Sequence, residues 1–429
     1  MVVTGSPPAA VVRVLRRMAV RRPHVLLVPV PGATGVRLAA ERLLRERGWP
    51  LADSPAAADI MVVCGQPGRS LADAVDQLWR QVPGPRARAR VASPDQVAAD
   101  LDRTVRQLAE AGAQRRDAVD RSPADTAPVD MSSDDMGSDD NGGMDMGSGD
   151  DGGMDMGGMD MPAGLMMADR GEDRDGLKLD QLHVQLGPVL PDWPAGLVLH
   201  VVLQGDVIQQ AELDLGPVEQ TAAGEPFWDR PLLATGSVGR ELARRRTAAA
   251  HLDSAHRLLA VAGWEDAAST AALVRDELLD DELLDAQVGQ RVARFARRVG
   301  RSRTLRWSTR GLGVLSGDDA MAAGIGGPAL RAAGDVHDRL MRWLSEAAGA
   351  LQRTDADDHP GEGSRGPLPT GGATRVDRAP SRAPSRALAE VIPSLIIGLD
   401  IAGARLVIAS LDPDTDELAW AATREPVDA

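Results

Sequence analysis

Short apolar runs alternate with amphipathic stretches in the N-terminal part of the chain. Residues 24–30 and 59–63 each begin with a polar residue and continue as a short apolar run, which is typical of buried strands. A turn follows each run, and apolar residues then recur at helical spacing up to the stops at Gly48 and at residues 83–85. Strand, turn and helix in repeated succession predict a small parallel α/β domain. A further helix is expected over residues 92–121, where Val97, Leu101, Val105 and Leu108 repeat.

The second half of the chain has a different pattern. Residues 198–203 and 207–213 alternate between apolar and polar positions around a turn at Gly205, which predicts an antiparallel hairpin. Helical spacing dominates afterwards, over residues 240–263 and 276–298 and after Pro328. One apolar stripe is formed by Leu284, Val288, Val292, Phe295 and Val299. The predicted fold class is therefore α+β, with a parallel α/β domain followed by an antiparallel sheet and a mainly helical body.

Two stretches lack any apolar periodicity and predict disordered linkers. The first holds twelve Asp without Lys or Arg and repeats the unit Met-Asp-Met, whereas the second is rich in Pro, Gly, Ser and Arg. The expected organisation is a loose basic N-terminus (1–23), the α/β domain (24–121), the acidic linker (122–169), the sheet and helical domain (170–352), the second linker (353–387) and a C-terminal segment (388–429).

The acidic linker also allows a functional interpretation. Ten of the fifteen methionines lie between residues 131 and 167, and thioether sulfur is a suitable ligand for Cu(I). No histidine accompanies them, and we find no export signal that would take the chain to a compartment where copper is handled. A flexible linker is therefore the main interpretation, and a soft-metal (copper) handling protein is kept as an alternative function.

Charge and cysteine usage exclude several classes of protein. The net charge is −15, and twelve of these charges belong to the acidic linker, which leaves no basic footprint for nucleic acid. The single cysteine, Cys64, precludes both an internal disulfide and a cluster held by four thiolates of this chain. No apolar run is long enough to span a membrane, and arginines interrupt the N-terminus, so we expect a cytoplasmic protein whose membrane association comes through partners.

Other candidate sites are weak. The turn at residues 31–35 follows a strand and precedes a helix, but it lacks the third glycine of a dinucleotide fingerprint and the Lys-Ser/Thr of a phosphate-binding loop. His251 and His256 are five residues apart, which does not stack them on one helix face as a metal pair. Cys64 ends a strand and is expected to be a small buried apolar residue. We therefore predict no catalytic residue, no metal ligand and no bound cofactor.

A glycine-rich run near residue 320 resembles a known family. Its order of residues is similar to the quinone-site subunit of bacterial NADH:quinone oxidoreductase (complex I), which is related to the large subunit of nickel–iron hydrogenases. The run at residues 408–412 also matches the end of that quinone-site subunit. The matching positions are Gly311, Gly313, Val314, Ser316, Asp319, Ala320, Gly327, Pro328, Leu330, Arg331, Ala332, Gly334 and Asp338.

The N-terminal domain resembles the small subunit of the same complex that carries an iron–sulfur cluster. The matching positions are Ala58, Asp59, Gly65, Leu78, Pro83 and Pro85. The tandem cysteines of that small subunit would fall near residues 29–32 and are absent here. The histidines and tyrosines that line the family's quinone pocket are also absent from the matching places, and the chain contains no Tyr.

The resemblance therefore implies a degenerate fusion of the cluster-carrying and quinone-site subunits. We expect a non-catalytic structural or accessory subunit of a complex-I-like or hydrogenase-like respiratory assembly, with other subunits as partners. A redox subunit that uses a partner's cluster is the alternative. The resemblance also places Arg331 at the contact between the two fused parts, so Arg331, Asp338 and Gly334 are candidates for the seam between the two domains. Arg331 and Asp338, seven residues apart, are expected on one face of one helix.

Overall fold

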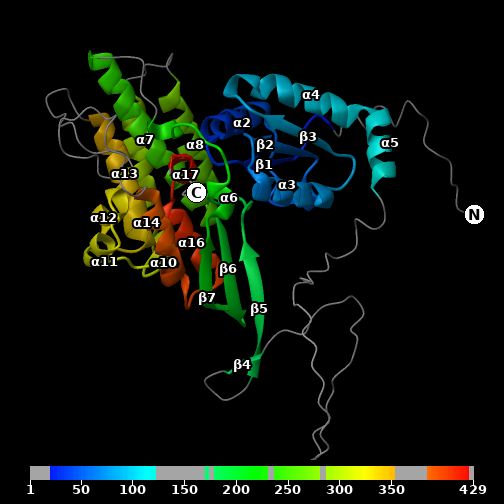
Figure 1. The fold of residues 1–429 in the computed structure, drawn as a ribbon. Helices are drawn as coiled ribbons and strands as arrows, with labels where there is room; N and C mark the ends of the chain where they lie inside the picture. The colour runs from blue at the N-terminus through cyan, green and yellow to red at the C-terminus, as the bar shows by residue number, and fades with distance from the viewer. Residues whose placement is uncertain are drawn as a thin grey trace, which may run out of the picture.

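The computed structural model describes residues 20–121, 170–172, 178–229, 236–280, 287–352 and 384–424. Both predicted linkers lie almost entirely outside these ranges, as does the stretch of repeated Met-Asp-Met. In Figure 1 the N-terminal domain lies on one side, the helical body on the other, and an antiparallel sheet extends below and between them. The α+β fold class predicted from the sequence is confirmed.

The N-terminal domain is built on a parallel sheet with the order β1-β2-β3. The central strand β2 is completely buried because its five residues are all apolar. Sequence patterns predicted the first two strands but not β3, whose alternating arginines hide its apolar positions. The helices α2 and α4 pack against each other. The elements are β1 (Val25–Pro29), α2 (Thr34–Arg47), β2 (Ile60–Cys64), α3 (Arg69–Gln81), β3 (Ala87–Val91), α4 (Val97–Ala109) and α5 (Ala111–Asp120).

The second sheet is antiparallel with the order β4-β5-β6-β7. Its predicted hairpin is confirmed, and Gly205 adopts a φ of 64° in the turn between the last two strands. The open edge of the last strand is covered, because the Ile208 amide donates to the Leu399 carbonyl near the C-terminus at 2.9 Å. The strands are β4 (Arg170–Glu172), β5 (Lys178–Leu186), β6 (Val198–Gln204) and β7 (Val207–Asp214), and the short helix α6 (Gly216–Glu219) follows.

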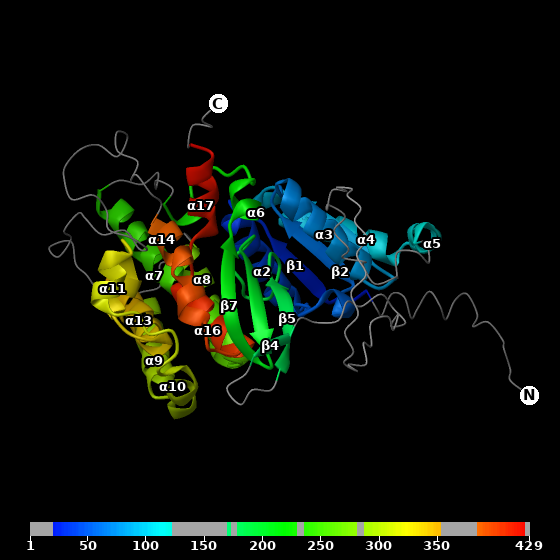
Figure 2. The same ribbon diagram turned by 60° about the horizontal axis from the view of Figure 1, so that its bottom comes forward.

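The helical body is organised around α7 (Gly236–Val261), which packs against α8 (Glu265–Leu279) and α13 (Val336–Gln352). The C-terminal helix α16 (Ile401–Leu411) also contacts it (Figure 2). No helix in the described ranges has the length and apolarity needed to cross a membrane. The remaining helices are α9 (Val288–Gly300), α10 (Arg303–Thr309), α11 (Gly317–Ala322), α12 (Gly327–Ala332), α14 (Pro384–Glu390), α15 (Ile392–Ile396) and α17 (Thr415–Ala422).

Three predicted helices are interrupted. The helix expected over residues 276–298 is wrong as one element, because α8 ends at Leu279 and α9 begins at Val288. Residues 92–121 form two helices that meet at Glu110. The single helix expected to carry both Arg331 and Asp338 is also wrong, since the chain turns at Ala333 with a φ of 43° between α12 and α13. Helical spacing persists across such breaks, so periodicity alone does not show them.

Each domain has its own core, and the larger core reaches into the smaller domain. Leu38 of α2 is only 5% exposed and packs with the apolar residues of the helical body rather than with its own sheet. Other side chains of the same helix, such as Leu44, fill the core around the parallel sheet. The helix α2 therefore lies between the two domains, and its side chains face both.

Candidate functional site

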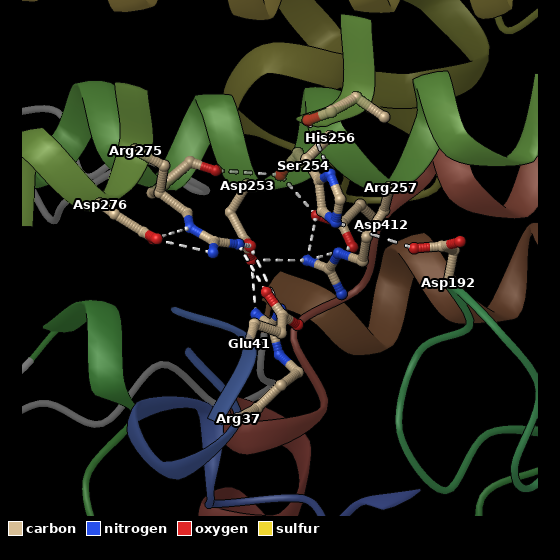
Figure 3. Close-up of polar contacts among 12 residues, drawn as sticks. Arg37, Glu41, Asp192, Asp253, Ser254, His256, Arg257, Arg275, Asp276 and Asp412 are labelled. Carbon is tan, nitrogen blue, oxygen red and sulfur yellow. Dashed lines mark hydrogen bonds and ion pairs between the residues drawn. The ribbon is translucent and has the colours of Figure 1, made fainter. Parts of the chain in front are cut away.

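The seam, which is the contact between residues 24–121 and the described residues from 178 onward, is held by charged side chains. Arg37 and Glu41 lie one turn apart on α2 and bind each other at 2.7 Å. Both side chains point towards the helical body (Figure 3). The i,i+4 spacing puts them on one face of the helix, next to the apolar positions that anchor α2.

Asp253 of α7 lies at the centre of this seam. Its carboxylate binds Arg37 at 2.7 Å and Arg275 of α8 at 2.6 Å, with Arg257 at 3.3 Å (Figure 3). The Asp253 side chain has no exposure to solvent, and neither has that of Arg275. Buried charges are tolerated only when they are paired, and here each finds at least one opposite charge.

The protonation of the two acidic groups follows from these contacts. Burial by itself would raise the pKa of Asp253, but the surrounding arginines outweigh this effect and hold the pKa well below its usual value. Burial likewise opposes ionisation of Glu41, while Arg37 and Arg275 lower the pKa of that carboxyl to about 2. Both carboxylates are therefore negatively charged at neutral pH.

The network extends from Asp253 in two directions. Arg257 binds Asp412, the residue after α16, at 2.8 Å, and Ser254 donates to the same carboxylate. On the other side, Arg45 of α2 and Arg275 both bind Asp276. Among the described residues, these contacts join four arginines (Arg37, Arg45, Arg257 and Arg275) to four carboxylates (Glu41, Asp253, Asp276 and Asp412), so the charges of this set balance.

A cavity of about 410 Å³ lies beside the network, between the two domains. Leu26 and Leu78 of the N-terminal domain contribute apolar wall, and Trp193 and Trp228 contribute aromatic wall from the other domain. The polar lining residues are Arg37, Glu41, Asp53, Ser54, Thr34, Gln81, Asp192, His256, Arg257, Asp414, Thr415 and Asp416. The volume is that of a small-molecule pocket.

Asp192 and His256 face each other across this cavity (Figure 3). The His256 Nε2 lies 4.0 Å from the Asp192 carboxylate, and its Nδ1 lies 2.9 Å from the Ala268 carbonyl oxygen. Asp192 has a φ of 56°, and burial raises the pKa of its carboxyl. An imidazole and a carboxyl in an apolar pocket are groups that can hold and transfer a proton. The sequence predicted that His251 and His256 would not form a metal pair. His251 lies 3.4 Å from Glu346, away from this contact.

The loop after β1 is where the resemblance would place the tandem cysteines of a cluster. Its Gly32 amide donates to the Asp416 carboxylate of α17 at 2.6 Å. A Cβ on Gly32, which has a φ of 84°, would lie 2.7 Å from the Ala223 Cβ, so this loop is packed against protein on both sides. The loop also contains no cysteine, so it offers no thiolate to an iron–sulfur cluster.

Cys64 does not provide such a thiolate. It is completely buried at the end of β2, as the sequence predicted. Burial raises the pKa of this thiol to about 12, so the thiol stays protonated at neutral pH. Within the described ranges, no three His, Cys, Asp or Glu side chains gather in a group suited to a metal ion.

The three seam candidates from the sequence lie within the helical body. Arg331 binds Glu346 of α13 through two hydrogen bonds of 2.7 and 2.8 Å. Asp338 accepts the Asp335 amide at the start of α13, and Gly334 is packed so closely that a Cβ would lie 2.8 Å from the Asp338 Cβ. These bonds do not reach the N-terminal domain, so the seam role of Arg331 stays a prediction without support from its observed partner.

A neighbouring arginine that sequence reasoning missed is buried instead. Arg339 is 1% exposed and donates to Ser410 of α16 and to the carbonyls of Gly313 and Gly334 at 2.9–3.0 Å. Burial lowers the pKa of its guanidinium to about 10. It ties the glycine-rich turns to the helix α16.

A partial signal for the missed seam residues was present in the sequence. Arg37 and Glu41, like Asp253 and Arg257, are i,i+4 pairs of opposite charge on stretches with helical spacing. Such pairs are usually exposed, and only the packing of α2 against α7 and α8 makes them the seam.

Comparison with known proteins adds a structural similarity. No protein-family profile and no curated protein matches the chain. Among solved structures, the chain is similar to one chain of the membrane-bound sulfane sulfur reductase, an archaeal respiratory membrane complex. The sequence identity is 14%, the TM-score is 0.38, and the match covers 55% of this chain and 98% of the other.

Proposed function

We propose that this protein is a non-catalytic accessory subunit of a complex-I-like or hydrogenase-like respiratory assembly. The observation that carries the proposal is the packed loop after β1. In the family that the sequence resembles, this loop carries cluster ligands, whereas here Gly32 is bound to Asp416 and closed off by Ala223. This packing of Gly32, together with the absence of cysteine from the loop, supports a chain without a redox centre at this place.

The charged seam supports the same proposal. A redox subunit exposes its centre to the neighbouring domain, but here the facing surfaces are joined by buried, charge-balanced ion pairs around Asp253. Breaking such pairs leaves uncompensated buried charge, so the two domains are expected to stay together as one rigid unit. Rigid units of this kind suit a structural role, with the other subunits of the assembly as partners.

Metal analysis and co-migration together test this proposal. The purified protein should contain no stoichiometric iron, acid-labile sulfide or nickel. In native gels of solubilised membranes, it should migrate with a respiratory complex, and removing the chain should reduce the amount of that complex. About four irons for each chain, as one four-iron cluster would give, would overturn the non-catalytic assignment. A protein that never migrates with such a complex would overturn the accessory role.

The cavity favours a second candidate, a redox subunit that uses a cluster from a partner. His256 and Asp192 could supply protons to a bound quinone in this pocket, whose walls combine apolar and aromatic side chains with polar ones. Because Trp193 and Trp228 line the cavity, a short-chain benzoquinone that binds there should quench tryptophan fluorescence. His256→Ala should weaken the quenching, while His200→Ala, on an exposed position of β6, should not. Equal quenching in parent and His256→Ala would remove support for this candidate.

A further inference from the structure

The end of α9 and the helix α10 carry a basic surface. Residues 286–317 contain eight arginines and no Asp or Glu, within a chain whose net charge is −15. Seven of the eight are exposed, and one of these seven, Arg298, is paired with an acidic residue of α8. We call the other six exposed arginines the basic surface: Arg294, Arg297, Arg301, Arg303, Arg306 and Arg310.

The fold forces these arginines outward. The apolar stripe of α9 is buried at Val292, Phe295 and Val299, and α10 is anchored by Leu305 and Thr309. The opposite faces of both helices must then face solvent. The Ser302 hydroxyl caps α10 by accepting the Leu305 amide at 3.3 Å, which fixes the turn between the two helices.

The basic surface lacks internal neutralisation. Arg291 and Arg298, the other two arginines of the stretch, bind Glu277 and Asp266 on α8. None of the six arginines of the basic surface makes an ion pair with any residue in the described part of the chain. Like charges crowded on two short helices repel one another, and an external anionic partner would relieve this repulsion.

An exposed aromatic side chain lies among the arginines of the basic surface. Trp307 of α10 is 83% exposed, and it lies three and four residues from Arg310 and Arg303, on the same side of the helix. Val314, just beyond the helix, is 58% exposed. The helix α10 forms one end of the helical body, at the lower edge in Figure 2. Within the described fold, the indole of Trp307 is left largely uncovered.

We propose that this surface docks directly on an anionic phospholipid membrane, with the arginines at the headgroups and Trp307 inserted at the interface. Arginine and tryptophan are the two residue types that combine attraction to anionic lipid with a preference for the boundary between water and hydrocarbon. An acidic protein would also match the arginines, and the depth at which Trp307 enters a bilayer distinguishes the two kinds of partner. Neither the accessory role nor the absence of a cluster is needed for this inference.

The test is sedimentation of the full-length protein with phosphatidylcholine vesicles, with and without phosphatidylglycerol. The protein should bind only the anionic vesicles, and more weakly at high salt. The triple variant R303E/R306E/R310E should lose at least about tenfold in binding. The matched control R106E/R115E/R116E makes the same change of charge on exposed positions of α4 and α5 and should bind like the parent. Thermal melting checks that both triple variants are folded.

Trp307 separates lipid from other anionic partners. Lipids with brominated acyl chains should quench part of the tryptophan fluorescence of the parent, and W307A should abolish this quenching and weaken binding severalfold. The proposal is overturned if the parent ignores anionic vesicles or if both triple variants lose binding equally. Binding without quenching of Trp307 would also overturn it, because attraction of the arginines to anionic headgroups would then suffice and the indole would not enter the interface.

Discussion

Asp253 shows how much of the seam depends on one residue. It binds Arg37, Arg257 and Arg275 without any exposure to solvent. We expect Asp253→Asn to lower the free energy of unfolding by about 3–5 kcal/mol, because it removes the charge that compensates three buried or half-buried arginines. Thermal or urea melting followed by circular dichroism measures the change.

The matched control is Asp76→Asn. Asp76 binds Arg88 at 2.6 Å in the same kind of pair, but its side chain is 62% exposed. Exposed pairs contribute only about 0–1 kcal/mol, so this variant should melt close to the parent. If both substitutions had equal, small effects, the network around Asp253 would not stabilise the seam.

Two carboxyls of α17 predict a pH dependence. Burial and the nearby charge of Asp414 raise the pKa of Asp416 to about 6. Burial, opposed by a hydrogen bond from Ser385, raises the pKa of Glu417 to about 7. Both pKa values exceed those of the same groups in an unfolded chain, which are near 4. Between about pH 4 and pH 7 the folded protein therefore binds more protons than the unfolded chain, so its stability should fall as pH rises through this range.

The variant Asp416→Asn/Glu417→Gln tests this dependence. It keeps the acceptors that the Gly32 and Ser385 amides use, but it cannot ionise. We expect the parent to lose on the order of 2 kcal/mol between about pH 5 and pH 7.5, and the variant to lose much less. Asp253 and Glu41 have lowered pKa values, so their contribution disappears only in more acidic solution and does not mask the effect. Identical pH profiles would contradict the prediction.

At the scale of an element, the loop after β1 packs closely against the rest of the protein at Gly32. Gly32→Ala should be strongly destabilising, because it combines a φ of 84° with a Cβ that would lie 2.7 Å from the Ala223 Cβ. Gly48→Ala, at the end of α2, has a φ of 64° but nothing within 4 Å. Gly48→Ala should lower the free energy of unfolding by roughly 1 kcal/mol, the cost of an alanine in the left-handed region. Gly32→Ala should lower it by about 1–3 kcal/mol more, because its Cβ also clashes. Equal melting temperatures would show that the loop is loosely packed.

The break between α12 and α13 is a second feature at the scale of an element. Apolar residues keep their helical spacing through Leu330, Val336 and Leu340, yet the chain turns at Ala333. The break places Asp338 in the first turn of a new helix, and Arg331 binds Glu346 rather than a residue of the N-terminal domain. The sequence pattern could not show this, because a turn of three residues hardly disturbs the register of apolar positions.

At the scale of the whole molecule, the seam should hold the domains together without the chain between them. We expect a protein with an engineered protease site within residues 122–169 to remain one particle in gel filtration after it is cut. Arg37→Ala should let the two fragments separate, because it removes the α2 partner of Asp253.

Arg331→Ala is the comparison for this experiment. Its observed partner is Glu346, in the same fragment, so the cut protein should stay intact and melt within about 1–2 kcal/mol of the parent. Separation of the fragments in Arg331→Ala but not in Arg37→Ala would reverse the assignment and support the seam role that the sequence resemblance gave to Arg331.

The sequence by itself determined what depends on neighbouring residues. Continuous apolar runs specified β1 and β2, alternation specified the hairpin of β6 and β7, and a strand end specified the burial of Cys64. These features follow from local periodicity, which burial of one face or of a whole strand imposes on the sequence.

Only the tertiary structure decided the seam and its cavity. Arg37 and Asp253 are 216 residues apart, and Gly32 and Asp416 are 384 residues apart, so no local pattern connects them. The charged pairs on α2 and α7 look like ordinary exposed i,i+4 pairs in the sequence. They become buried and essential only because α2 packs against the helical body, and that packing depends on the shapes of both domains.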